Sequence, residues 1–209
     1  MTTPAAPDDA SLKTANGLLL VISGPSGVGK TTITHAVERS FASAVFSVSY
    51  TTRPITPQDR EGVDYFFISE ASFDEKIAAG AFLEHAGVFG KRYGTPRTWV
   101  EEQLSDGRLV ILEIDVQGAI NVKKAMAEAF CLFVLPPSEE ELLRRLRARG
   151  REDETTIQRR FGAAQHEIAV AKSCGVYDRF LVNSILPGTV KEAIDVVGGE
   201  LARRGMPRG

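Results

Sequence analysis

The residues with the clearest chemical potential run from Gly24 to Thr31, with the sequence Gly-Pro-Ser-Gly-Val-Gly-Lys-Thr. They match the phosphate-binding pattern Gly-x4-Gly-Lys-Ser/Thr, and they stand between a predicted strand and a predicted helix, as that chemistry requires. In such a loop, backbone N–H groups turn inward onto the phosphates of a nucleotide, and glycines permit the close approach. Lys30 would add a positive charge and Thr31 a hydroxyl for Mg²⁺. An ordinary glycine-rich turn would explain Gly24 and Gly27, but not the Lys-Thr pair.

A group of arginines later in the chain could stabilise a phosphoryl group during its transfer. Arg145 and Arg149 stand four residues apart at the end of a predicted helix, Gly150 follows, and Arg160 lies on the next helix. Residues four apart share one helix face, and a guanidinium suits the spread negative charge of a phosphoryl group. The ordinary alternative is a solvated face paired with nearby acids. A phosphate-binding loop in the same chain favours the functional interpretation.

A second set of polar residues, between the loop and these arginines, could hold a phosphate acceptor. Arg53 precedes a proline, which favours extended geometry, and Tyr65 and Tyr93 are candidate hydroxyl donors to a phosphate. Carboxylates that could accept hydrogen bonds from a purine occur at Glu84, Glu113 and Asp115. For each tyrosine or acid taken singly, a packing or surface role is equally plausible.

Strand-like and helix-like segments alternate along the chain, which predicts an α/β fold with a parallel sheet flanked by helices. Strands are predicted at 18–22, 109–114, 131–135 and 180–182, and helices at 31–39, 117–128, 138–149 and near the C-terminus, where Val190, Ile194, Val197 and Leu201 form an apolar stripe. Residues 44–95 change to short alternating segments, including 65–68. These residues predict a small inserted β-rich lobe, with one helix begun by Ser72-x-x-Glu75.

Composition limits the class of protein. The chain has 209 residues, enough for one globular domain with a full core, and a formal net charge of −2, so no overall positive field recruits nucleic acid or an acidic membrane. Cys131 and Cys174 form no metal-ligand spacing, and no apolar run approaches the length of a membrane span. We expect a cytoplasmic protein, as a monomer or homodimer, with a flexible N-terminal tail at 1–16 and a C-terminal tail at 204–209.

Several motifs, taken in order, resemble the guanylate kinase family, whose members transfer a phosphoryl group from ATP to GMP or dGMP. Besides the phosphate-binding loop, the motifs are Ser-Val-Ser-Tyr-Thr-Thr-Arg-Pro (47–54), Gly-Val-Asp-Tyr-Phe-Phe (62–67), Gly-Ala-Phe-Leu-Glu (80–84), Tyr-Gly-Thr-Pro (93–96), Leu-Glu-Ile-Asp-Val-Gln-Gly (112–118) and Pro-Pro-Ser (136–138). The resemblance covers about residues 17–201. It implies a guanylate-kinase-like domain at 17–203, with a core at 17–43 and 96–203, a GMP-binding lobe at 44–95 and a lid at 144–160.

The resemblance also implies a role for each matching residue. The guanine and its surroundings would be held by Ser49, Glu84, Thr95, Glu113 and Asp115, and the GMP phosphate by Arg53, Tyr65 and Tyr93. ATP would be bound by Ser26, Gly27, Val28, Gly29, Lys30, Thr31, Thr32 and Asn183, with Mg²⁺ at Thr31. Catalytic charge stabilisation would come from Lys30, Arg53, Arg145, Arg149 and Arg160. Positioning and charge neutralisation are nearly all that this reaction needs.

Two other functions remain open at this point. Guanylate-kinase-like domains of scaffold proteins bind phosphorylated peptides without transferring phosphate, although they typically have a degraded ATP loop, whereas Lys30 and Thr31 are present here. Another P-loop nucleoside monophosphate kinase, or a P-loop ATPase, would share the fold and the phosphate grip. Glu84 and the 47–54 motif are what favour guanine.

The chain departs from the family pattern at two places. Thr56 occupies the position of a second arginine that grips the acceptor phosphate, and Arg60 follows four residues later. Ser184 and Ile185 follow Asn183, where the family commonly has an acidic pair. The loss of a hydrogen bond to a charged group costs about 1.5–3 kcal/mol, which would weaken GMP use about ten- to hundredfold. Our hypothesis is that Arg60 supplies part of the missing grip.

This hypothesis predicts the behaviour of two variants. Thr56→Arg should tighten GMP binding about ten- to hundredfold, because it restores a hydrogen bond from a charged donor. Arg60→Ala should weaken GMP binding. The half-saturating GMP concentration in a coupled assay measures both effects. Unchanged affinity in Thr56→Arg, together with wild-type behaviour of Arg60→Ala, would contradict the hypothesis.

Overall fold

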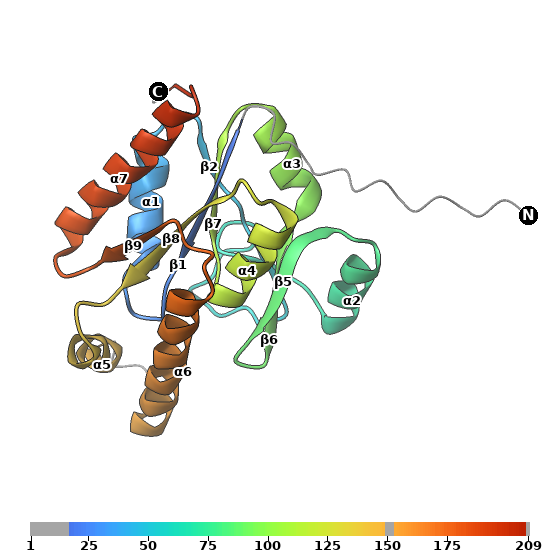
Figure 1. The fold of residues 1–209 in the computed structure, drawn as a ribbon. Helices are drawn as coiled ribbons and strands as arrows, with labels where there is room; N and C mark the ends of the chain where they lie inside the picture. Colours follow the sequence, from blue (N-terminus) through green and yellow to red (C-terminus); the bar gives the residue numbers. More distant parts are fainter. Residues whose placement is uncertain (1–16, 149–152, 208–209) are drawn as a thin grey trace, which may run out of the picture.

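A five-stranded parallel sheet forms the centre of the molecule (Figure 1). The computed structural model describes residues 17–148 and 153–207. In spatial order the strands are β2 (Ala44–Phe46), β7 (Leu109–Glu113), β1 (Leu18–Ser23), β8 (Phe130–Leu135) and β9 (Arg179–Val182). The predicted strands are confirmed, and so is the α/β class.

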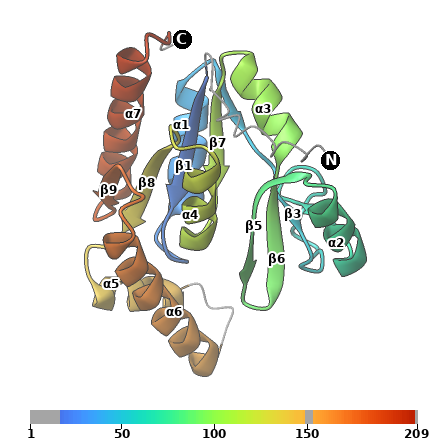
Figure 2. The same ribbon diagram turned by 45° about the vertical axis from the view of Figure 1, so that its right-hand side comes forward.

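Alternation along the central strands divides the core into two layers. Leu18, Leu20 and Ile22 of β1 face α1 (Lys30–Ser40) and α7 (Leu186–Arg203), whereas Leu19 and Val21 face α3 (Arg97–Ser105) and α4 (Val116–Ala125). Every residue of β1 is buried, because the parallel strand is covered on both sides. Figures 1 and 2 show these helix pairs on opposite faces of the sheet. Burial on both faces of the sheet therefore explains why the central strands are continuous apolar runs in the sequence.

A second, four-stranded sheet forms the β-rich lobe. Its strands are, in spatial order, β4 (Phe66–Phe67), β3 (Tyr50–Thr51), β6 (Lys91–Pro96) and β5 (Phe82–Val88), and α2 (Glu70–Ala78) lies beside them. The expected lobe boundary at residue 44 needs correction, because β2 pairs with β7 in the core sheet. The lobe therefore begins after Phe46.

Two helix ends differ from the sequence-based prediction. Ser69, not Ser72, begins α2, because its side chain accepts the backbone N–H of Ser72 and so satisfies the first turn. Helix α4 ends at Ala125 instead of residue 128, because the chain becomes extended at Met126, whose side chain is buried against the core. Helix α3 was not predicted.

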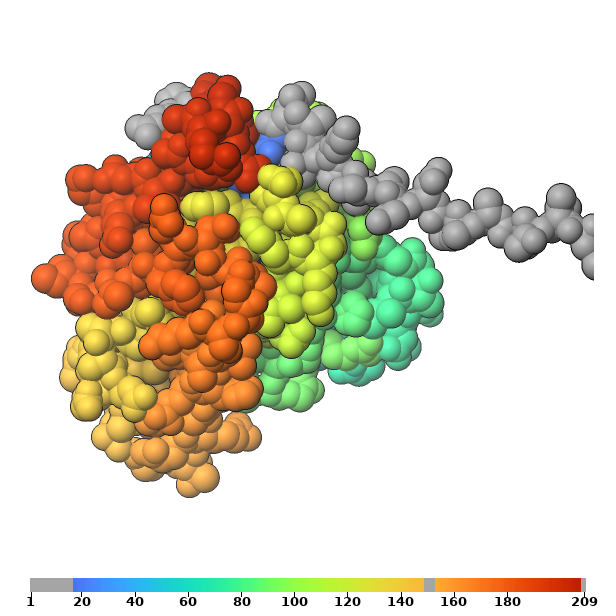
Figure 3. All heavy atoms as spheres, in the orientation of Figure 1, coloured from blue at the N-terminus to red at the C-terminus, as the bar shows by residue number. Residues whose placement is uncertain are grey.

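Helices α5 (Glu139–Ala148) and α6 (Glu154–Ser173) project beyond the sheet as a pair (Figure 1). The expected lid, 144–160, falls on this pair, which is called the lid from here on. Leu142 and Leu146 of α5 pack against Ile157 and Ala164 of α6 and give this pair its own small core. Figure 3 shows α5 and α6, in gold to orange, on one side of α4, and the lobe, in green, on the other. The lid and the lobe therefore stand on two sides of one edge of the core. Arg149 and Gly150 lie outside the described residues.

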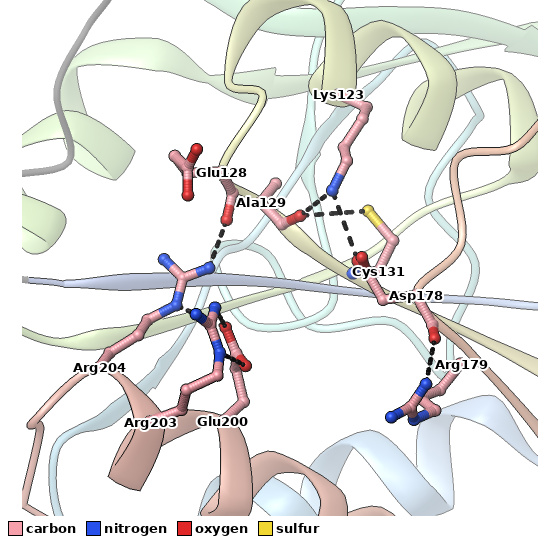
Figure 4. Close-up of polar contacts among 9 residues, drawn as sticks. All are labelled: Lys123, Glu128, Ala129, Cys131, Asp178, Arg179, Glu200, Arg203 and Arg204. Carbon is pink, nitrogen blue, oxygen red and sulfur yellow. Dashed lines mark hydrogen bonds and ion pairs between the residues drawn. The ribbon is translucent and has the colours of Figure 1, made fainter.

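The end of α7 is fastened to the core by a network of charged side chains (Figure 4). Glu200 accepts from Arg203 (Nη2 to Oε1, 2.7 Å) and from Arg204 (Nε to Oε1, 2.6 Å), and Arg204 Nη2 also donates to the carbonyl of Glu128 at 2.7 Å. Met206 joins the apolar core. Part of the expected C-terminal tail, 204–209, therefore packs onto the domain, through the bonds of Arg204 and the burial of Met206.

The two arginines of this network should differ in their contribution to stability. The Arg204 side chain is 18% exposed, and that of Arg203 is 68% exposed. Arg204→Ala should lower the free energy of unfolding by about 1–3 kcal/mol, because the buried Glu200 carboxylate loses one of its two arginine donors and the Glu128 carbonyl loses its bond to Arg204. Arg203→Ala should cost about 0–1 kcal/mol, as exposed ion pairs do. Urea unfolding measures both, and equal effects would contradict the assignment.

Candidate active site

The phosphate-binding loop joins β1 to α1 at the carboxyl edge of the sheet. Gly24 has φ +147°, and a Cβ there would lie 2.5 Å from the carbonyl oxygen of Val134. At Gly29, with φ +96°, a Cβ would lie 2.8 Å from Asn183 Nδ2, which donates to the carbonyl of Val28 at 2.8 Å. Any side chain at either position would displace this packing. The glycines therefore let the loop sit against β8 and the residue that follows β9.

Lys30 and Thr31 begin α1, and each is held by a defined contact. Lys30 Nζ donates to the carbonyls of Gly24 and, at 3.3 Å, of Pro25, so its ammonium group lies back over the loop. Thr31 Oγ1 donates to Glu113 Oε1 at 2.9 Å. A cavity of about 200 Å³ surrounds these groups and is lined by Ser26, Gly27, Gly29, Lys30, Thr31, Thr32 and Glu113. The positions match a site for a phosphate chain.

A larger cavity, of about 290 Å³, lies between this loop, the β-rich lobe and α6. Its lining includes the expected Ser26, Lys30, Ser49, Tyr65, Glu84, Tyr93, Glu113, Asp115 and Arg160. Glu113 and Lys30 line both cavities, which are therefore neighbours. Residues more than a hundred positions apart in the sequence meet here because the lobe and α6 flank the carboxyl edge of the sheet.

Two carboxylates, the buried Glu84 and the partly buried Asp115, line the larger cavity. Glu84 on β5 accepts from Thr95 Oγ1 at 2.6 Å, and burial raises its pKa to about 7. Asp115 caps α4 by accepting the N–H of Gly118 at 2.7 Å, and burial also raises its pKa. The negative charge of Asp115 further raises the pKa of Glu84. These carboxylates could accept hydrogen bonds from a ligand that carries N–H groups.

Arg53 is held at the edge of the lobe by a carboxylate. Its Nη1 and Nη2 donate to the two oxygens of Asp59 at 2.8 Å each, and its guanidinium lies 5.3 Å from the ring centre of Tyr65. Thr56 donates to Asp59 from both its backbone N and its Oγ1, at 2.7 Å each. Arg53 and Thr56 together hold the pKa of Asp59 well below its usual range. The position that lacks the second arginine therefore supports the first one.

Arg60 points to a different partner from the one the hypothesis requires. Its backbone N donates to Asp64 Oδ2 at 2.8 Å, its Nε lies 3.4 Å from the same oxygen, and its side chain is 72% exposed. It does not line the larger cavity. In this conformation the hypothesis that Arg60 replaces the missing arginine gains no support.

The remaining expected residues lie around the two cavities. Arg145 donates to the carbonyl of Asn183 at 2.9 Å, which joins the lid to the end of β9. Thr95 is buried behind Glu84, and Val28 is buried beneath the loop. Arg149 falls outside the described residues. Arg53 does not line the larger cavity but contacts Tyr65, which does.

Several residues that line the larger cavity were not predicted from the sequence. Val88 and Phe89, at the tip of the β5–β6 hairpin, line the cavity, and Arg159 of α6 lies 5.9 Å from the Phe89 ring centre. Glu167 of α6 lines it as well. Its spacing from Arg160, two helical turns, was the available signal, because it places both on one face of a helix.

Comparisons with known proteins agree with this geometry. A family model described as guanylate kinase matches residues 16–198. A protein named guanylate kinase from Anaeromyxobacter dehalogenans is 46% identical over 94% of this chain and 86% of its own length. A guanylate kinase from Coxiella burnetii is 42% identical, over 89% of each chain.

A solved structure agrees as well. The crystal structure of guanylate kinase from Anaplasma phagocytophilum superposes with a TM-score of 0.73, at 33% identity over 88% of this chain and 86% of that one. The motif order, the cavity between phosphate-binding loop and lobe, and these matches over most of the sequence lead to one conclusion: the chain belongs to the guanylate kinase family.

Proposed function

We propose that this guanylate kinase transfers the γ-phosphoryl group of ATP to GMP or dGMP in the cavity between the phosphate-binding loop and the β-rich lobe, yielding ADP and GDP or dGDP. One observation carries the assignment of the site: a single cavity brings Lys30 of the loop together with the carboxylate Glu84 and the hydroxyls of Tyr65 and Tyr93. A donor phosphate and an acceptor nucleotide could therefore meet there. The product would enter purine nucleotide metabolism.

The guanine base would lie against the carboxylate wall. Guanine carries an N1–H and an exocyclic amine, and the matching acceptors are Glu84 and Asp115, with Ser49 on the same cavity. Thr95 holds Glu84 in place by donating to it. Adenine has no hydrogen on N1, so a buried ionised Glu84 facing it would keep an unpaired charge. This difference favours guanine as the acceptor base.

The acceptor phosphate would be held by Arg53, Tyr65 and Tyr93. Burial raises the pKa of Tyr65 to about 12, so its hydroxyl stays protonated and can donate at neutral pH. Nη1 of Arg53 donates to Asp59 and to the carbonyl of Pro54, and Nη2 donates one of its two hydrogens to Asp59. The N–H of Nε and the second hydrogen of Nη2 could then form two parallel bonds to a phosphate. We propose that Thr56 contributes indirectly, by holding Asp59 in place.

ATP would bind on the side of the phosphate-binding loop. Its phosphates would lie along residues 26–32, and Asn183 and Arg145 would lie nearer its adenosine end. Thr31 and Glu113 present adjacent oxygen atoms, which is the chemistry that Mg²⁺ prefers when it is shared with substrate phosphates. A hydroxyl and a carboxylate fit Mg²⁺, so we propose that Thr31 and Glu113 hold Mg²⁺ together with the phosphates of ATP. When bound, Mg²⁺ neutralises phosphate charge during the transfer.

Catalysis would then depend on positioning and on positive charge. The lid carries Arg145, Arg149 and Arg160, and the loop carries Lys30, so closure of the lid over both nucleotides would surround the transferring group with cations and exclude water. The γ-phosphoryl would pass in line to an oxygen of the GMP phosphate. No covalent intermediate with the protein is proposed.

We also propose that the enzyme works in the cytoplasm. Cys131 and Cys174 are free thiols, as expected in a reducing compartment. Within the described part of the chain, none of the helices has the length and apolarity needed to cross a membrane.

Replacement of Lys30 tests the assignment of the loop. Lys30→Ala should lower kcat at least about hundredfold in a coupled assay with ATP and GMP, since a donor aimed at transition-state charge is lost. Lys191→Ala is the matched control, because Lys191 is 79% exposed on α7. It should retain wild-type turnover.

Two outcomes would contradict the proposal. Full activity of Lys30→Ala would show that Lys30 of the phosphate-binding loop is not needed for catalysis. A wild-type protein that binds GMP but forms no ADP would instead be a binding module. The same assay is run with AMP, CMP and UMP in place of GMP. Turnover with one of these but not with GMP would contradict the proposal that guanine is the acceptor base.

The pKa of Glu84 predicts how GMP use depends on pH. Because the ionised form accepts hydrogen bonds from guanine, a pKa of about 7 leaves Glu84 mostly protonated at pH 6 and mostly ionised at pH 8. The value of kcat/KM for GMP should therefore rise about tenfold between these pH values. Glu84→Gln should flatten this rise, and it should lower kcat/KM at pH 8. A Glu84→Gln profile parallel to that of the wild type would contradict the assignment.

A further inference from the structure

The turn that joins β5 to β6 carries a residue type that its backbone disfavours. Strand β5 ends at Val88 and β6 begins at Lys91, and these two residues pair, so Phe89 and Gly90 form a two-residue turn. Their φ angles are +49° and +74°, and a turn with two positive φ values favours Asn, Asp or Gly at its first position. Among the described residues, Phe89 is the only non-glycine with a positive φ. A bulky side chain is therefore held in a conformation that such residues rarely adopt.

Packing of the apolar core does not explain why an aromatic ring stands in this turn. Phe89 is 54% exposed, and the apolar clusters of the described chain do not include it. It does line the larger cavity, next to Val88. Strained backbone conformations of this kind persist where function requires them, and they gather at active sites and ligand clamps. The turn is therefore a candidate for a role in the reaction.

One contact gives the ring a partner outside its own lobe. The guanidinium carbon of Arg159, on α6, lies 5.9 Å from the centre of the Phe89 ring, which is within the reach of a cation–π contact. Figure 2 shows the tip of the β5–β6 hairpin and α6 at the same end of the molecule. Arg159 is exposed and lines neither cavity of the proposed site. The contact therefore joins the β-rich lobe directly to the lid.

The two elements that meet here carry different parts of the proposed site. Glu84 on β5 and Tyr93 on β6 line the larger cavity from the hairpin, and Arg160, which follows Arg159 on α6, lines it from the lid. Helices α5 and α6 have a small core of their own, so a contact with the lobe would limit how this pair moves. A displacement of about 1 Å at a catalytic group can change a rate by about a hundredfold. The hairpin contact thus lies where it can affect Arg160.

We propose that Phe89 and Arg159 are positioning residues, whose contact fastens the tip of the β5–β6 hairpin to α6 and so sets the place of Arg160 over the bound acceptor. The proposal rests on the proposed function, in which Arg160 stabilises the transferring phosphoryl group. Arg159 touches neither nucleotide and acts through the Phe89 ring. Because the hairpin carries acceptor-binding residues, this contact couples the acceptor side of the site to closure of the lid.

Replacement of the ring separates this role from a structural one. Phe89→Asn puts into the turn a residue that favours a positive φ, so its melting temperature should equal or exceed that of the wild type. Its kcat should nevertheless fall about five- to thirtyfold, as expected for loss of a partly desolvated cation–π contact. Phe89→Tyr keeps an aromatic ring and should retain kcat within about twofold of the wild type. Phe89→Leu should lose as much kcat as Phe89→Asn.

Replacement of the cation tests the other half of the contact. Arg159→Gln should lower kcat by the same five- to thirtyfold, about the effect of losing the cation–π contact, while the KM values for ATP and GMP change less than about threefold. Lys172→Ala is the matched control, because Lys172 is another exposed cation of α6, and it should keep wild-type turnover. When Phe89 is already asparagine, Arg159→Gln should lower kcat less than about twofold further, since both residues act through one contact.

Several results would overturn the proposal. They are wild-type kcat in Phe89→Asn or in Arg159→Gln, additive losses in the double variant, or a loss in Phe89→Tyr as large as that in Phe89→Leu. A melting temperature of Phe89→Asn clearly below that of the wild type would make the ring a structural residue and would overturn the proposal as well.

A measurement without turnover keeps these outcomes apart from failure of the proposed function. Hydrogen exchange of the α6 amides, followed with GMP present, should be faster in Phe89→Asn and Arg159→Gln than in the wild type and Lys172→Ala, because loss of the contact frees the lid. Equal exchange in all four proteins would reject the contact even if the reaction is confirmed. Turnover of ATP with GMP by the wild type tests the reaction itself.

Discussion

The close packing of the phosphate-binding loop against β8 and Asn183 is the constraint on which the rest of the site depends. At Gly24 and Gly29 the backbone lies so near to Val134 and Asn183 that no side chain fits. The loop is thereby held at the carboxyl edge of the sheet, where Lys30 and Thr31 begin α1. The lobe and the lid are placed around this edge, so their functional side chains are useful only if the loop is in position.

Buried negative charge organises the acceptor side of the cavity. Glu84, Asp115 and Glu167 come from β5, the start of α4 and α6, and burial raises the pKa of each. Thr95 donates a hydrogen bond to Glu84, and the backbone N–H of Gly118 donates one to Asp115. Such a set suits a base that donates hydrogen bonds, and it repels a misplaced phosphate. Charge complementarity therefore supports the proposal that the two ends of GMP are recognised by different walls.

The proposed phosphate-binding group around Arg53 shows how neighbouring residues can compensate for a local change in sequence. By pattern alone, Thr56 looked like a missing arginine. In the folded lobe Thr56 binds Asp59, and Asp59 holds Arg53 through two hydrogen bonds. The site therefore has one arginine in a fixed orientation where the family pattern has two. A sequence comparison shows which charged residues are present. The hydrogen-bond partners of a charged side chain decide which of its donors a ligand can still bind.

The sequence by itself determined the elements whose cause is local. The loop at 24–31 was predictable because neighbouring residues set its backbone, and the central strands because continuous apolar runs suit a sheet covered on both faces. Motif order was enough to indicate the family. Tertiary structure alone decided that β2 belongs to the core sheet, that Thr56 supports Arg53 through Asp59 and that Glu167 lines the same cavity as Lys30. These contacts join segments through the packing of whole elements or the fold of a loop, so residue type and spacing did not reveal them.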